Sequence, residues 1–306
     1  KVRAFRDDLR SLIDTIGTEL GPVAPTLAID RLLRFIATHE RVFERVDDFS
    51  GYVQDVYYHA IRMVGELCQV LPEPDADLMP ERIMALLGES MHGYLTDLAT
   101  TVAPHLPQGT LTRWDGNLKE AIADRKAQEK TRKSDGWFYS ITSQWTEMRQ
   151  TIATARGDID LLVGLEENKQ PHMQDTLGIA AQLLQAGRAS EALDWVRKLG
   201  QRRVNDADSD VSPVRVSLEA RILEAIDDKP AAQALRWRCF QAALSADILR
   251  EYLKHLPDLE AIASVEPAHA LSLAKAKPQS ALLLFPDWPR PALAANVTQI
   301  DSPRYI

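Results

Sequence analysis

The chain has 306 residues, of which 45% are hydrophobic and 26% charged, and its formal net charge is −8. This hydrophobic content is sufficient for one long helical array or for two domains. The acidic balance argues against general nucleic-acid binding and against a polybasic membrane contact. No apolar run approaches the ~20 residues that cross a bilayer, so we expect no membrane association. The only two cysteines, Cys68 and Cys239, lie far apart in apolar helical patterns and indicate free thiols in a reducing cytoplasm.

Helical spacing of apolar residues begins near the N-terminus and continues through the first half of the chain. Phe5, Leu9 and Ile13 lie on one face of the first expected helix, which we expect Gly17 and the Gly21–Pro22 pair to end. Prolines and glycines separate the later amphipathic segments. These segments predict further helices over residues 27–43, 53–67, 80–87 and 94–102.

A charged segment without apolar spacing separates two halves of the chain. We predict an N-terminal helical-repeat half over residues 1–123, a charged hinge or helix tip over 124–136, and a C-terminal half over 137–306. The basic residues of the tip are interrupted by Glu129, which favours a solvated tip over a nucleic-acid contact.

The clearest motif is a helix–turn–helix unit of the tetratricopeptide (TPR) kind over residues 176–199. The small residues Ala180 and Ala192 would let two antiparallel helices approach closely, with Gly187 at the turn. A second copy, in which Ala220 and Ala232 replace this pair of alanines, lies forty residues downstream along the printed sequence. The copies differ at position 196, a valine, whose counterpart is Arg236.

These patterns predict an all-α fold, since alternation typical of strands is scarce. The expected architecture is a right-handed α-solenoid of antiparallel helix pairs, HEAT-like in the first half and TPR-like in the second.

A dense group of ionisable residues forms one candidate polar site. Its members are His39, Arg41, Arg45, Asp47 and Asp48. Adjacent carboxylates could hold a divalent cation and an arginine could clamp an anion, but the oxygens are too few and too clustered for a calcium loop. We therefore favour a helix end followed by a capped helix start, and predict neither a metal site nor a cofactor.

A second candidate site combines arginine with aromatic residues near the end of the repeat region. Its members are Arg236, Trp237, Arg238 and Tyr252. Such side chains concentrate binding energy at interfaces, so they could contact a protein or peptide partner. The alternative is a core Trp237 flanked by arginines whose stems are buried. We expect Arg236 to be replaceable without unfolding the protein.

Several stretches resemble an uncharacterised bacterial family, a domain of unknown function with a TPR-like solenoid. They are residues 41–51 with Asp55 and Val56, then residues 233–237, 244–246 and 249–258, and the neighbourhood of Ala281 and Trp288. The resemblance spans roughly residues 1–289, and residues 296–306 depart from the pattern. It implies bacterial cytoplasmic helical-repeat proteins that extend beyond both ends of this chain, and it supplies no catalytic residues.

No phosphate-binding, dinucleotide-binding or zinc-protease motif occurs in the sequence. We therefore predict a non-catalytic helical-repeat scaffold that binds a protein or peptide partner. The chain starts at Lys1 rather than Met, which motivates an alternative, a regulatory or recognition module of a larger multidomain protein. Less favoured alternatives are a cryptic metal-dependent hydrolase and a nucleic-acid-associated protein.

Overall fold

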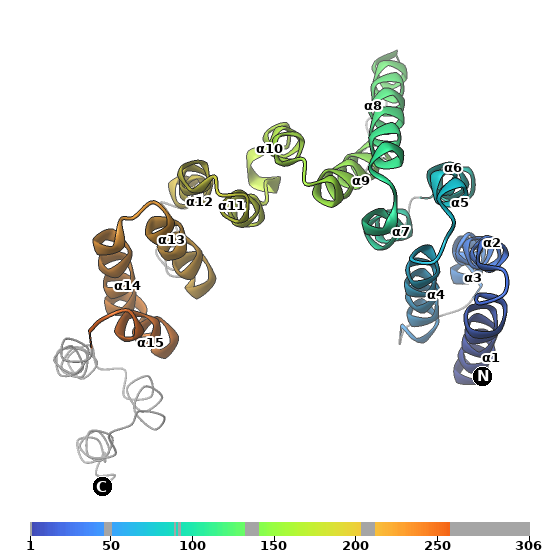
Figure 1. The fold of residues 1–306 in the computed structure, drawn as a ribbon, viewed down its shortest axis with the longest axis horizontal. Helices are drawn as coiled ribbons and strands as arrows, with labels where there is room; N and C mark the ends of the chain where they lie inside the picture. Colours follow the sequence, from blue (N-terminus) through green and yellow to red (C-terminus); the bar gives the residue numbers. More distant parts are fainter. Residues whose placement is uncertain are drawn as a thin grey trace, which may run out of the picture. The chain divides into compact units, whose positions relative to one another are not determined.

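A computed structural model describes residues 2–45, 51–88, 90, 93–131, 141–202 and 212–257 (Figure 1). These residues are helical almost throughout, and none of them lies in a strand, so the all-α prediction is confirmed. None of the described helices combines the length and apolar character that crossing a bilayer requires.

The chain divides into two compact units, Lys1–Asn168 and Lys169–Ile306. The division therefore follows α10 (Ile159–Glu167) rather than the charged segment 124–136. The described part of that segment, residues 124–131, forms the end of the long helix α8.

The first unit contains helices of uneven length. They are α1 (Val2–Thr15), η1 (Ile16–Leu20), α2 (Pro25–Ile36), α3 (His39–Phe43), α4 (Tyr52–Cys68), α5 (Glu73–Asp77), α6 (Met79–Leu87), α7 (Tyr94–Val102), η2 (Ala103–His105), α8 (Gln108–Thr131), α9 (Ile141–Arg156) and α10.

Helical backbone continues past Gly17, contrary to the expectation from the sequence, and ends at Gly21 and Pro22, as expected. The chain continues beyond α1 as a π-helical turn, η1, in which Gly17 is buried. A Cβ atom at Gly17 would collide with the side chain of Met63, and one at Gly21 would collide with Leu67. Both glycines therefore allow the backbone after α1 to approach α4 closely.

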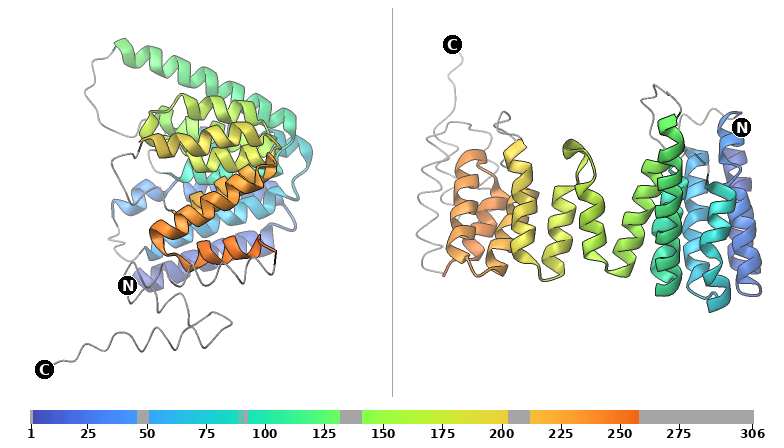
Figure 2. Two further views of the ribbon diagram at one scale, coloured as in Figure 1. Left: turned by 90° about the vertical axis from the view of Figure 1, so that its left-hand side faces the viewer. Right: turned by 90° about the horizontal axis from the view of Figure 1, so that it is seen from above.

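Three helices of the first unit, α1, α4 and α7, run in the same direction. Arg3 hydrogen-bonds Tyr52 near the start of α1 and α4, and Asp14 contacts His59 further along both. Between α4 and α7, the Tyr58 and Tyr94 rings lie 5.5 Å apart. Gly65 and Thr101, which lie seven residues after Tyr58 and Tyr94 respectively, also pack together, so α4 and α7 run in the same direction. Figure 2 shows these helices side by side.

The second unit contains η3 (Pro171–Met173), α11 (Thr176–Gln185), α12 (Ala189–Arg202), α13 (Pro213–Ala225), α14 (Lys229–Ala243) and α15 (Ala246–Lys254). The helices α11 and α12 pack against each other, and Ala180 and Ala192 are fully buried. Gly187 forms the turn with φ +78°, a left-handed conformation that glycine adopts without a steric cost.

The downstream copy repeats this packing with α13 and α14. Ala220 and Ala232 are fully buried, and Asp227 occupies the place of Gly187 with φ 64°. Aspartate tolerates this left-handed conformation better than most residues. Beside the turn, the Asp228 carboxylate accepts a hydrogen bond from the backbone N–H of Ala231 and caps α14.

Candidate functional site

A groove of about 360 Å³ lies on the second unit, between α13 and α15. Ser217 and Arg221, one turn apart, line it from α13, while Glu251 and His255 line it from α15. Val216 and Ile248 provide buried apolar surface at its base. The groove is therefore made mainly by α13 and α15, with one residue, Arg236, contributed by α14.

Arg236 is held at the base of this groove by neighbouring polar groups. Its Nη1 atom lies 2.8 Å from Glu224 Oε1 and donates a hydrogen bond of 3.1 Å to Gln233 Oε1. His255 Nε2 lies 3.6 Å from the same Glu224 oxygen. Glu224 thus links α13 to both later helices.

In the described part of the chain, most charged side chains near the rim of the groove form ion pairs, but one arginine does not. Lys254 pairs with Glu251 at 3.6 Å, and Arg250 pairs with Asp247 at 2.9 Å. Arg221 is exposed and forms no ion pair with any residue that the structure describes. Arg221 is therefore the cation of this groove that remains available to a ligand.

Of the four residues that the sequence suggested for partner binding, the structure brings Trp237 and Tyr252 together, and only Arg236 lines the groove. Arg236 is only 3% exposed and its guanidinium is the buried half of an ion pair, so we now expect its replacement to affect folding, contrary to the expectation from the sequence. Trp237 is half-buried, with ring centroids 5.5 Å from Phe240 and 5.1 Å from Tyr252. Arg238 is exposed and does not line the groove.

In the predicted polar site, His39 is a buried residue of the core rather than an exposed ligand. His39 is 1% exposed, its Nδ1 lies 2.8 Å from the carbonyl oxygen of Ile36, and its Nε2 lies 3.1 Å from Ser90 Oγ. Its ring also meets the edge of Tyr94, at 4.9 Å between centroids. His39 therefore joins the α3 region to the segment before α7 and is built into the core. A serine paired with a histidine can act as a nucleophile in catalysis. Ser90 is only 7% exposed, however, so a substrate would have little access to its hydroxyl.

Of the remaining members of the predicted polar site, the structure describes only the two arginines. Arg41 and Arg45 are exposed, and Asp47 and Asp48 lie outside the described residues. Among the residues that are described, no three His, Cys, Asp or Glu side chains lie where they could hold one metal ion.

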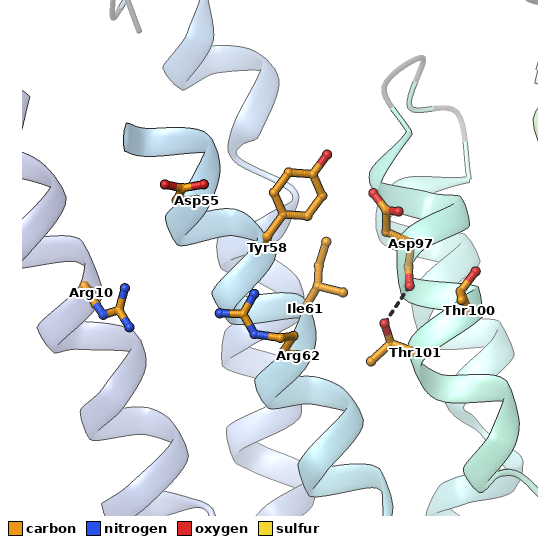
Figure 3. Close-up of a pocket in the computed structure, with 8 residues that line it drawn as sticks. All are labelled: Arg10, Asp55, Tyr58, Ile61, Arg62, Asp97, Thr100 and Thr101. Atoms are coloured by element: carbon orange, nitrogen blue, oxygen red, sulfur yellow. Dashed lines mark hydrogen bonds between the residues drawn. The ribbon is translucent and has the colours of Figure 1, made fainter. Parts of the chain in front are cut away.

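A second groove, of about 500 Å³, lies on the first unit and was not indicated by the sequence analysis (Figure 3). It is lined from α1, α4 and α7 by Arg10, Asp55, Tyr58, Ile61, Arg62, Asp97, Thr100 and Thr101. Nothing in the sequence places these residues together, because they come from three helices whose common direction is set by packing.

Arg62 in this groove is oriented by a chain of polar contacts. Asp14 Oδ1 lies 2.6 Å from His59 Nε2, and His59 Nδ1 lies 3.4 Å from Arg62 Nη2. With the Nε2 proton donated to Asp14, the Nδ1 atom is left to accept from Arg62. Arg10 lies one turn before Asp14 on the same face of α1.

Asp97 lines the groove from the first turn of α7. Its carboxylate makes no hydrogen bond or ion pair with any described residue, and partial burial raises the pKa of this carboxyl above its ordinary value. Thr101, one turn later, donates its hydroxyl proton to the Asp97 carbonyl oxygen at 2.8 Å and leaves the carboxylate to the groove.

Comparison with known proteins adds one match. A family model described as a family of unknown function (DUF6880) matches residues 1–302. No curated protein and no solved structure matches the chain.

Proposed function

Because the chain belongs to the family of unknown function DUF6880, we propose its function from the molecule itself: a non-catalytic helical-repeat scaffold that binds an extended segment of a protein partner. The segment would lie in the groove between α13 and α15. The alternative is that the chain is a recognition module of a larger multidomain protein and binds another part of that protein.

A repeated turn supports the helical-repeat architecture. Between α9 and α10, between α11 and α12, and between α13 and α14, one left-handed residue reverses the chain: Gly157, Gly187 and Asp227. The next residue's N–H donates to a carbonyl five residues earlier in every case, at 2.9, 2.9 and 2.8 Å. Identical turns between helices that pack together are what antiparallel helix pairs require, and stacking such pairs gives a right-handed α-solenoid.

The groove is the observation that carries the binding proposal. Within the second unit, α13 contacts α11 on one side and α15 on the other, in addition to its own partner α14. First helices of successive pairs form the concave, ligand-binding face of helical-repeat proteins. We infer that α13 and α15 are two such helices, and the buried Val216 and Ile248 of the groove would offer an apolar floor to a bound chain.

The charges favour an acidic side chain at one position of that segment. Arg221 is exposed at the groove, and a carboxylate would form a bidentate contact with its guanidinium. The other charges of the rim are paired, so they would contribute specificity and association rate more than affinity. The free thiols Cys68 and Cys239 are both buried, which suits the reducing cytoplasm we propose as the location.

Capture of a partner by matched variants tests the proposal. We expect Arg221→Ala to reduce recovery of the partner at least tenfold relative to the wild-type chain. Arg238→Ala, which removes an exposed arginine outside the groove, should leave recovery unchanged. If Arg221→Ala and Arg238→Ala recover equal amounts of the partner, the partner does not bind at Arg221 and the proposal is wrong.

A further inference from the structure

We propose that the groove between α1, α4 and α7 is a second binding site, which takes a basic amino acid with a free carboxylate. The ligand would be free lysine or arginine, or the C-terminal lysine or arginine residue of a polypeptide. Its carboxylate would lie between Arg10 and Arg62, and its side-chain cation would reach Asp97 beside the ring of Tyr58. This site is separate from the α13–α15 groove of the second unit.

Two guanidinium groups form the carboxylate end of the site. Figure 3 shows Arg10 on α1 and Arg62 on α4 directed toward each other. Neither forms an ion pair with a carboxylate in the part of the chain that is described, although Asp14 lies close by. Asp14 is already engaged with His59 at 2.6 Å. Two like charges that converge without a counter-ion favour an anion between them, and arginine binds a carboxylate in a bidentate manner.

The Asp14–His59–Arg62 chain prepares Arg62 for this role. The side chain of His59 is only 15% exposed, and its contact with Arg62 restricts where the guanidinium can lie. A pre-oriented guanidinium loses less conformational entropy when a ligand binds than a freely moving one does.

Asp97 and Tyr58 form the cation end. The half-buried Asp97 carboxylate has no described hydrogen-bond or ion-pair partner, so an ammonium or guanidinium group would supply one. The Tyr58 ring is 37% exposed and is braced edge-on by Tyr94, 5.5 Å away. An exposed tyrosine face attracts a neighbouring cation.

The balance of charge selects a zwitterionic ligand over a simple anion. Two arginines and two aspartates, Asp55 and Asp97, line the same cavity. A phosphate dianion would gain from Arg10 and Arg62 but would be repelled by the carboxylates. A ligand with one carboxylate and one distant cation satisfies both groups, and a cavity of about 500 Å³ is large enough for a basic amino acid.

Isothermal titration of the full chain tests this site with defined probes. The probes are L-lysine, L-arginine, norleucine, lysine amide and an N-acetylated pentapeptide ending in lysine, with inorganic phosphate as a comparison. We expect binding of at least one lysine- or arginine-type probe with a free carboxylate. Norleucine lacks the side-chain cation and lysine amide lacks the carboxylate, so both should bind at least tenfold more weakly. Binding of the pentapeptide alone identifies a polypeptide terminus, whereas binding of the free amino acids alone identifies a small molecule.

Matched variants locate the site. Arg62→Gln and Asp97→Asn should each weaken binding at least tenfold, while Arg31→Gln and Asp8→Asn, which change exposed residues outside the groove, should not. Circular dichroism spectra that match the wild type would show that the variants are folded. Absence of binding by every probe, stronger binding of phosphate, or equal affinity in all variants would overturn the proposal.

Discussion

Arg236 and Glu224 form an ion pair of 2.8 Å at the α13–α15 groove, at a position where one repeat copy has a charged residue and the other an apolar one. The counterpart of Arg236 in the first copy is Val196, which is fully buried. The second copy therefore places a charge where the first has an apolar contact, and Glu224 on α13 compensates for it.

Replacement of Arg236 is expected to destabilise the second unit. Arg236→Ala leaves Glu224 without its closest cation and opens a space in the packing, so we expect a loss of about 3 kcal/mol. Arg238→Ala, next but one along the same helix and exposed, should stay within about 0.5 kcal/mol of the wild type. Urea unfolding measures both, and equal midpoints would show that the ion pair contributes little.

Enlargement of Ala192 tests the packing between α11 and α12. Ala192→Leu adds three carbon atoms at a fully buried position, so we expect it to lower the free energy of unfolding by about 1–3 kcal/mol. Ala181→Leu makes the same change at an exposed position of α11 and serves as the control. An Ala192→Leu variant with the urea midpoint of its control would contradict the assigned contact.

Asp97 gives a pH-dependent prediction for the first unit. Burial raises the pKa of the Asp97 carboxyl above its ordinary value of 3.8, so the folded protein binds this proton more tightly than the unfolded chain does. The associated stability is present below pH 3.8 and is lost as the pH rises through the raised pKa. Asp97→Asn should therefore raise the melting temperature at pH 7, and the difference should shrink toward pH 3.8. A lower melting temperature for Asp97→Asn at pH 7 would show that the carboxylate has a stabilising partner.

The Cys68 thiol should be unreactive in the folded protein. Burial raises its pKa from 9.0 to about 12, so the reactive thiolate is scarce at pH 8. Iodoacetamide should label Cys68 only after unfolding in urea, as mass spectrometry of the labelled peptide would show. The same shift means that stability is present below pH 9 and is lost as the pH rises toward 12. Labelling of native Cys68 within minutes would contradict its burial.

Much of the local structure follows from short-range patterns in the sequence. Small residues at Ala180 and Ala192 and a glycine between them were enough to identify the α11–α12 unit. The sequence does not mark the turn at Asp227, because glycine is the usual signal of a left-handed residue, whereas aspartate also adopts this conformation. The sequence favours Gly17 as a helix end, because its close approach to Met63 depends on a helix far along the chain.

The sites depend on contacts that a linear pattern does not contain. Arg236 looked like an exposed anchor because its partner Glu224 lies on a different helix. Likewise, Arg10, Arg62 and Asp97 come from α1, α4 and α7, and only the packing of these helices brings them to one groove. The sequence favours His39 as part of a local polar cluster, but its partner Ser90 lies 51 residues further along the chain, and both side chains are buried.

Site-specific crosslinking tests the central claim, that a partner segment lies between α13 and α15. A photoreactive phenylalanine would replace Ser217, which is exposed and lines the groove, and in a second variant Ala234, which is exposed on α14 and does not line it. After irradiation in the native host, mass spectrometry would identify the crosslinked peptides. We predict one recurrent partner segment from position 217, lost when Arg221→Ala is added, and no such product from position 234. The same products from both positions, or no crosslink from position 217, would contradict the account.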